Sequence, residues 1–210
     1  MNTKAHHTTC RARSRQSWVA AGLAVTCLVG VIHLHSLAAR PQELVYDHID
    51  PTTGYRTERY QAAVPETPPA GKRIFIEDID RLIANEKAVL VDVSPITGMG
   101  YDPATGRWRT AKRHSSLPGA IWLPEVGRGV IDASVERFFR TELDRLSGGN
   151  KAHPIILFCN ADCWMSWNAM KRAAGFGHTR LYWFPEGIDG WSDWDRQLVP
   201  IEPKSLALDR

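Results

Sequence analysis

Short apolar runs alternate with helix-type patterns between residues 73 and 202, and this alternation restricts the folds open to the chain. Continuous apolar runs of this length are typical of parallel strands that are buried on both faces of a sheet. Repeated strand–helix units predict an α/β fold with a mostly parallel central sheet flanked by helices. The four runs are "AVLVDV" (88–93), "PGAIWLP" (118–124), "PIILF" (154–158) and "RLYWF" (180–184).

Helix patterns fill the intervals between these runs. Residues 77–86 place apolar side chains at helical spacing after acidic residues that suit a first turn. Residues 132–149 place five apolar side chains on one face, and Gly148 is a suitable C-terminal cap. Two further helices are expected, one directly after Cys163 and one over residues 187–198.

Residues 1–38 have the pattern of a secretory signal peptide. A basic segment without acidic residues precedes an apolar run at 19–32, and Ser36-Leu37-Ala38 fits the small-x-small cleavage rule, so we expect cleavage just before Ala39. An uncleaved membrane anchor is the alternative, but the apolar run has only about 14 residues where a membrane span needs roughly 20. The basic residues of the segment are Lys4, Arg11, Arg13 and Arg15.

Loss of the signal peptide changes both the charge and the cysteine content. The whole chain has 26 basic and 23 acidic residues, and the leader carries four of the basic ones, so the exported chain is close to neutral. We therefore expect no nucleic-acid binding, and no membrane contact after cleavage. Cys10 and Cys27 leave with the leader, whereas Cys159 and Cys163 remain, and an oxidising compartment favours their pairing.

The rest of the chain divides into three parts. Residues 39–72 are proline-rich with little periodicity, which predicts an extended N-terminal arm. Residues 73–202 suffice for one domain with its own core, and residues 203–210 form a C-terminal tail. The connection at 96–116 is long, and its basic residues suit an acidic partner, although a solvated loop is the simpler interpretation. These residues are Arg107, Arg109, Lys112 and Arg113.

Cys159 is the strongest candidate for chemistry because of its position. It directly follows the run at 154–158, and ligands of parallel sheets bind beyond the carboxyl ends of the strands. The N–H groups at the start of the next helix favour a thiolate there over a thiol. Cys163, four positions along, could attack a persulfide or mixed disulfide on Cys159 and close an internal disulfide. A static disulfide that pins the loop is the alternative.

Other residues near this edge of the sheet are weaker candidates. Asp92 ends another core strand and could orient the loop, while His114 precedes a proline-glycine turn and could border a pocket. His153 and His178 flank strands and are predicted at the surface. No further ligands stand at metal spacing around the cysteines, so neither a metal nor a cofactor is expected. The loop candidates around the cysteines are Asn160, Ala161, Asp162, Trp164 and Met165.

Several of these segments resemble a rhodanese domain in their order and spacing, over about residues 74–202. The resemblance implies a rhodanese-like fold in which Cys159 begins the active-site loop. It also implies that Cys159 carries a persulfide while sulfane sulfur moves from a small donor, such as thiosulfate, to an acceptor. The segments are "AVLVDV", "HSSLPGAIWLP", "ILFC" with the loop and helix after it, and "LYWFPEGIDGW".

A closer resemblance also covers the arm. The segments "GYRTERYQAAVP", "WLPEVGRG", "CNADCWMSWNAMKRA" and "YWFPEGIDGW" are similar to exported rhodanese-like proteins associated with PQQ-dependent catabolism and labelled by a CxxCW motif, although this chain reads CxxxCW. The resemblance implies a periplasmic protein that supports oxidation by quinoproteins. A non-catalytic rhodanese-fold module, which binds a quinoprotein dehydrogenase or a c-type cytochrome through the arm and the basic loop, is the alternative.

The cysteine loop departs from the usual rhodanese pattern. Trp164 replaces the basic residue often found near the sixth loop position, and Asp162 adds a negative charge. A carboxylate at contact distance repels an anion by about 1 to 4 kcal/mol, depending on screening. Thiosulfate is therefore disfavoured as a substrate, whereas the second thiol of Cys163 favours thiol redox chemistry.

Overall fold

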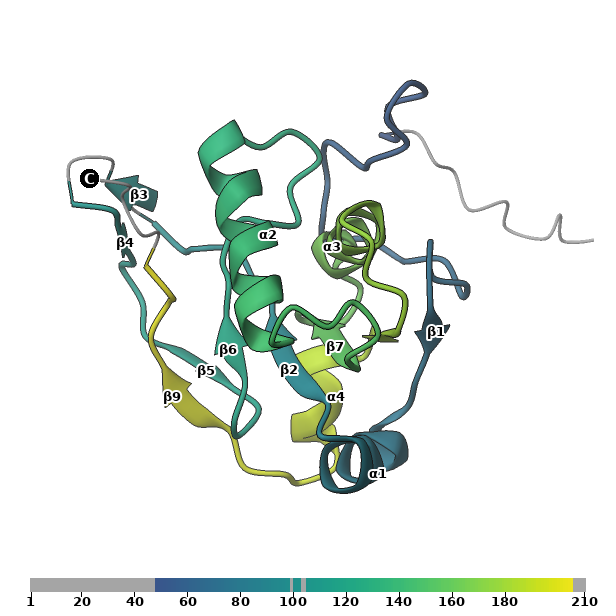
Figure 1. The fold of residues 1–210 in the computed structure, drawn as a ribbon. Helices are drawn as coiled ribbons and strands as arrows, with labels where there is room; N and C mark the ends of the chain where they lie inside the picture. The colour runs from purple at the N-terminus through teal and green to yellow at the C-terminus, as the bar shows by residue number, and fades with distance from the viewer. Residues whose placement is uncertain (1–47, 99, 103–104, 206–210) are drawn as a thin grey trace, which may run out of the picture. The chain divides into compact units, whose positions relative to one another are not determined.

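The structure is a computed structural model that describes residues 48–98, 100–102 and 105–205 (Figure 1). These residues belong to a unit that spans Pro41–Arg210. The predicted signal peptide lies outside the described residues. Among the helices of the described segments, none has the length and apolar character needed to cross a membrane.

A five-stranded sheet forms the centre of the domain, and every neighbouring pair of its strands is parallel. The strand order is β1-β8-β7-β2-β6, so β7 lies in the middle and all four of its side chains are buried. This confirms the predicted α/β fold with a mostly parallel sheet. The strands are β1 (Lys72–Arg73), β2 (Val89–Asp92), β6 (Ile121–Trp122), β7 (Ile155–Phe158) and β8 (Leu181–Phe184).

Helices cover both faces of this sheet. Alternate side chains of each strand point to opposite faces, so neighbouring residues of one strand pack against different helices. Leu157 and Trp183 belong to the apolar cluster that includes side chains of α2 and α3. Ile156 and Phe184 belong to the other cluster, with side chains of α1 and α4. Figure 1 shows the four helices around the sheet. They are α1 (Ile76–Glu86), α2 (Ala133–Leu146), α3 (Trp164–Gly175) and α4 (Gly187–Asp193).

The helix ends follow the local sequence. The carboxylate of Asp78 accepts the backbone N–H of Phe75 at 3.3 Å, which caps the start of α1. Gly148 has a φ of 60° just after α2, the left-handed conformation in which glycine commonly ends a helix, as predicted. The last helix is shorter than its predicted span of 187–198, since α4 ends at Asp193.

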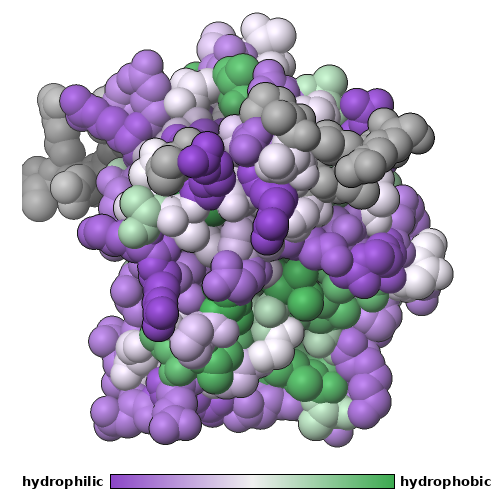
Figure 2. Space-filling view, turned by 90° about the vertical axis from the view of Figure 1, so that its left-hand side faces the viewer, coloured by the Kyte–Doolittle hydropathy of each residue, from purple (hydrophilic) through white to green (hydrophobic). Residues whose placement is uncertain are grey.

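Two small antiparallel sheets occupy segments that carry no strand prediction. In the long connection at 96–116, β3 (Gly100–Asp102) pairs with β4 (Arg107–Arg109). Farther along, β5 (His114–Ser116) pairs with β9 (Val199–Ile201). Figure 2 looks onto the side of β5 and β9 and shows hydrophobic side chains gathered in the lower half of this face. Strands of three residues are too short to produce a readable alternation in sequence.

The described part of the predicted arm, residues 48–71, lies against the domain. Its residues Ile49 and Arg56 form an antiparallel bridge around a turn. Asn168 of α3 accepts the backbone N–H of Arg56 at 3.0 Å and donates to its carbonyl oxygen at 2.8 Å. In the predicted tail, Pro203 forms a parallel bridge with Trp122 of β6, and the backbone N–H of Lys204 donates to the carbonyl oxygen of Trp122 at 2.9 Å.

The prediction of a surface position for His178 is wrong. The residue is only 2% exposed, and its Nε2 lies 3.4 Å from a carboxylate oxygen of Asp144 and 3.4 Å from Nζ of Lys151. Histidine is usually at least partly exposed, so its residue type pointed to the surface. Here the chain between α3 and β8 turns inward and buries the imidazole.

This burial predicts a pH dependence of stability. Desolvation, and then the nearby Lys151 cation, lower the pKa of His178 from its ordinary value of 6.5. The unfolded chain therefore binds the proton more readily, so stability is full above about pH 6.5 and falls as the pH drops toward the folded-state pKa, by up to about 1.4 kcal/mol per pH unit. We expect His178→Gln to flatten this decline in denaturant titrations at several pH values. Parallel declines in both proteins would contradict the assignment.

Candidate active site

Cys159 lies where the sequence predicted it, directly after β7. The turn between β8 and α4 fixes its main chain, because the backbone N–H of Ile188 donates to the carbonyl oxygen of Cys159 at 2.9 Å. Gly187 has a φ of 56°, and a Cβ at this position would clash with the same carbonyl oxygen. Only glycine combines this conformation with this close approach. The carboxyl ends of two neighbouring strands thus meet at the cysteine.

The two candidate cysteines are joined in the structure. Cys159 and Cys163 form a disulfide, with their Cα atoms 6.1 Å apart. Cys159 is fully buried and Cys163 is 4% exposed, and both belong to the apolar cluster under α2 and α3. The disulfide thus lies just before α3 and is shielded from solvent.

Three residues form the short loop between the cysteines. Asp162 is exposed and has a φ of 51°, a left-handed conformation that aspartate adopts more readily than most residues. The backbone N–H of Ala161 donates to a carboxylate oxygen of Asp189 at 2.8 Å. Asn160 lies 3.5 Å from the hydroxyl of Ser94, measured between the two side-chain oxygens. Asp162 and Asp189 are both acidic and exposed, which disfavours an anion at this loop.

Trp164 and Met165 belong to the first turn of α3 and not to the loop. Each is 1% exposed, so neither side chain offers an open surface to a small molecule. The indole Nε1 of Trp164 donates to the carbonyl oxygen of Ala63 at 3.0 Å, and the guanidinium of Arg56 lies 4.7 Å from the ring centre. Trp164 therefore connects the arm to α3.

The arm runs directly over the cysteine loop, a contact that sequence reasoning missed. The backbone N–H of Trp164 donates to the carbonyl oxygen of Tyr60 at 2.8 Å, and the N–H of Ala62 donates to Asp162 at 2.9 Å. The side-chain amide of Gln61 donates to the carbonyl oxygen of Ala161 at 2.5 Å. A sequence pattern could not reveal these bonds, because most of them use main-chain groups.

Asp92 and His114 belong to a buried polar cluster beside the loop. Asp92 is fully buried, and one carboxylate oxygen lies 2.7 Å from Nε2 of His114 and accepts the hydroxyl of Ser116 at 2.6 Å. The other oxygen accepts the backbone N–H of Ser94 at 2.8 Å. The cluster joins the carboxyl end of β2 to β5, and reaches the cysteine loop through Ser94 and Asn160.

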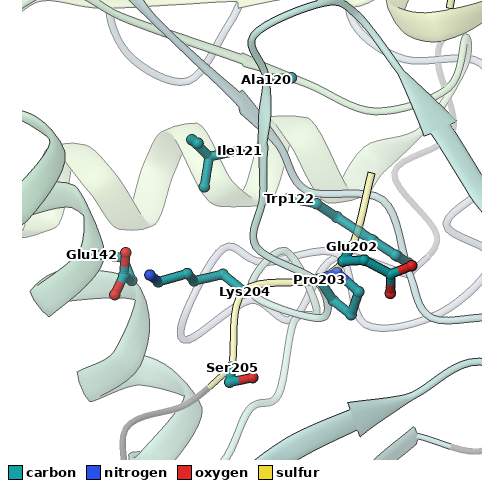
Figure 3. Close-up of a pocket in the computed structure, with 8 residues that line it drawn as sticks. All are labelled: Ala120, Ile121, Trp122, Glu142, Glu202, Pro203, Lys204 and Ser205. Carbon is teal, nitrogen blue, oxygen red and sulfur yellow. The ribbon is translucent and has the colours of Figure 1, made fainter. Parts of the chain in front are cut away.

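A cavity of about 560 Å³ lies at the β6 edge of the sheet. Figure 3 shows its lining, in which the Lys204 ammonium points toward the carboxylate of Glu142. Among the described residues that line it, none belongs to the cysteine loop. We therefore do not include it in the candidate site. Its lining residues are Ala120, Ile121, Trp122, Glu142, Glu202, Pro203, Lys204 and Ser205.

Several solved structures are similar to part of the chain at low identity. A thiosulfate sulfurtransferase from Pseudomonas aeruginosa matches with a TM-score of 0.45 and 14% identity, over 66% of this chain and 22% of that one. A polysulfide-sulfur transferase homodimer from Wolinella succinogenes matches with a TM-score of 0.39 and 17% identity, over 61% of this chain and 78% of that one. An uncharacterized protein from Saccharomyces cerevisiae matches with a TM-score of 0.36 and 19% identity, over 59% of this chain and 92% of that one.

The chain thus spans less than a quarter of the length of the Pseudomonas enzyme. The comparison with curated proteins finds no match. The Rhodanese-like domain family matches residues 76–193, which is more than half of the chain and includes β2, β7, the cysteine loop and α4. The parallel sheet, the cysteine after its central strand and this family match together place the chain in the rhodanese family.

Proposed function

We propose that the protein carries out sulfur transfer or thiol–disulfide redox chemistry through Cys159, with Cys163 as the resolving thiol. The observation that supports this most strongly is the disulfide between the two residues at the carboxyl end of the central strand. Membership of the rhodanese family favours a persulfide on Cys159 as the form that carries sulfur. Cys163 then attacks the inner sulfur of this persulfide, so that the disulfide forms and hydrosulfide leaves.

Thiosulfate fits this loop poorly as the donor. Asp162 and Asp189 put two exposed carboxylates at the loop, and the main-chain N–H of Trp164 already donates to the arm. The two carboxylates would repel a dianionic sulfur donor such as thiosulfate. The N–H of Trp164 is also already bonded, so it is not available to the anion. We expect weak or absent thiosulfate:cyanide sulfurtransferase activity in the wild-type protein.

A charge-removing substitution tests this expectation. Asp162→Asn keeps a residue that tolerates the left-handed conformation but removes the negative charge. We expect thiosulfate turnover to rise by a few-fold, up to about tenfold if the repulsion approaches 1.4 kcal/mol. The matched control is Asp193→Asn, an exposed aspartate at the end of α4 that should change little. Vigorous wild-type activity that Asp162→Asn does not improve would contradict the electrostatic argument.

The cellular role we propose is export to the periplasm in support of quinoprotein oxidation. It depends on the predicted signal peptide and on the similarity to exported proteins of PQQ-dependent catabolism. N-terminal sequencing should place the mature end near Ala39, whereas an intact Met1 in the membrane fraction would indicate an anchored protein facing the periplasm.

A second candidate function is a binding module for a quinoprotein dehydrogenase or a c-type cytochrome. The observation that favours it is the exposed basic loop, whose four cations all lie at the surface around β4. The two functions separate in growth on an alcohol oxidised by a PQQ enzyme. If the double variant Cys159→Ser, Cys163→Ser abolishes growth and a variant with four Ser substitutions in the basic loop grows normally, the redox function stands. If the double cysteine variant grows normally and the basic-loop variant does not, the result supports the binding module. The four positions are Arg107, Arg109, Lys112 and Arg113.

A further inference from the structure

The arm pairs with the cysteine loop as one antiparallel strand with another. Hydrogen bonds join Trp164 to Tyr60 and Ala62 to Asp162, and they flank the bridge between Gln61 and Cys163. In such a pair the two central residues exchange no backbone hydrogen bond, their Cα atoms are about 4.5 Å apart and their side chains lie on the same face. The residue at position 61 is therefore held beside the sulfur of Cys163.

Indole groups extend this contact along the arm. Nε1 of Trp164 donates to the carbonyl oxygen of Ala63, and Nε1 of Trp167 donates to that of Thr67 at 3.4 Å. We call the main chain of residues 162–164 and these two indoles the strand-docking surface. It contacts carbonyl and N–H groups that every polypeptide carries, while the side chains of Gln61 and Ala63 are exposed. The surface thus recognises an extended main chain and permits varied side chains.

Two main-chain hydrogen bonds and two indole hydrogen bonds hold the arm on this surface. The pairing is an isolated bridge and not part of a sheet. A strand with a better sequence could therefore take the arm's place.

We propose that the strand-docking surface binds an extended, cysteine-containing segment of a client protein in place of the arm, with the client cysteine at the position of Gln61. This inference rests on the proposed redox function of Cys159 and Cys163, and it names the substrate class as a polypeptide dithiol. The arm is then an occupant in cis that keeps the disulfide covered until a client arrives.

The exchange follows from this placement. The client thiolate attacks Sγ of Cys163, a bond forms between the two sulfurs, and Cys159 leaves as a thiolate at the end of β7. A second client thiolate then attacks the client sulfur of this mixed disulfide and releases Cys163. Two electrons pass from the client dithiol to the protein disulfide, and the two client thiols give up two protons to water.

The first test measures the placement of position 61. In a Cys159→Ser background, with oxidised glutathione as the oxidant, Gln61→Cys should form a disulfide with Cys163 at least tenfold faster than Ala62→Cys, whose side chain points to the other face of the strand. Peptide mapping without reduction identifies the bonded pair. Equal rates for the two variants would overturn the register.

The second test measures the client preference. The probe is a synthetic peptide of residues 58–67 with cysteine in place of Gln61, and its control is a scrambled peptide of the same composition. Ala62→Pro removes the N–H that bonds to Asp162 and so loosens the arm. With this variant, we expect the matched peptide to form the mixed disulfide with Cys163 at least tenfold faster than the scrambled one, and faster than it does with the wild-type protein.

Each other outcome has a definite meaning. Equal rates for the matched and scrambled peptides would overturn the inference and leave the redox function standing. Equal rates for the matched peptide with wild type and Ala62→Pro would show that the arm does not occupy the client's place. If neither peptide nor glutathione reduces the disulfide in either protein, the proposed redox function itself fails.

Discussion

Replacing Cys163 with serine is expected to leave a stable adduct on Cys159. A sulfane-sulfur donor or a mixed disulfide can still modify the Cys159 thiolate, but the serine hydroxyl is not ionised at neutral pH and cannot displace the added group. Intact mass after incubation with a persulfide donor should show at least about tenfold more adduct than in the wild-type protein. Cys159→Ser is the matched variant and should accumulate no persulfide, because the residue that accepts the sulfur is gone.

A static disulfide predicts a different result for the same pair of variants. Both substitutions would then cost a similar free energy of unfolding, about 2 kcal/mol or less for so short a loop, and neither would accumulate an adduct. Mass and denaturant titration on the same samples therefore separate the two accounts. An adduct that forms equally in both variants would assign the chemistry to another group.

Asp92→Ala is expected to destabilise the domain by about 3 kcal/mol or more. The change leaves the buried N–H of Ser94 and the hydroxyl of Ser116 without their acceptor, and each buried polar group left unpaired costs about 1 to 3 kcal/mol. Removal of the partner of His114 adds to this loss. Urea titration of the purified protein measures the effect.

The control for this prediction is Asp189→Ala. Asp189 also accepts a backbone N–H, from Ala161, but it is exposed, so water can replace the lost acceptor and the cost should be at most about 1 kcal/mol. A loss for Asp92→Ala no larger than for Asp189→Ala would contradict the structural role of the cluster. Adduct formation on Cys159 should survive in Asp92→Ala protein that remains folded, because the hydrogen bonds of Asp92 go to Ser94, His114 and Ser116 and not to the sulfur.

The sheet was predictable because its strands are buried on both faces. Ile155–Phe158 is apolar throughout and Val89–Asp92 is apolar up to its last residue, and such runs are visible in a single sequence. The same logic placed Cys159 at the carboxyl end of a central parallel strand, which is where the structure has it. The helix after Cys163 was predictable because strands and helices alternate along the sequence.

The contacts of the arm were not predictable, because they use main-chain atoms. Tyr60 and Asp162 contribute carbonyl oxygens to these contacts, and no side-chain pattern reports where a carbonyl points. The contact of Asp189 with the cysteine loop was also missed. Its acidic side chain in the predicted last helix was the one signal in the sequence that could have pointed to it. The pairing of β3 with β4 was missed because each strand has only three residues, and Trp108 is the one buried residue of β4, between two exposed arginines.

The central claim is that Cys159 and Cys163 change their redox state, and intact mass of the protein isolated from cells tests it most directly. Rapid acid quenching followed by alkylation of free thiols separates the reduced, disulfide and persulfide forms by mass. The account predicts that a dithiol reduces the disulfide to two thiols, which trapping records as two alkylations. A sulfane-sulfur donor that is added to the reduced protein before trapping should restore the disulfide with release of hydrosulfide. A disulfide that stays intact in every molecule, before and after exposure to the dithiol, would contradict the account.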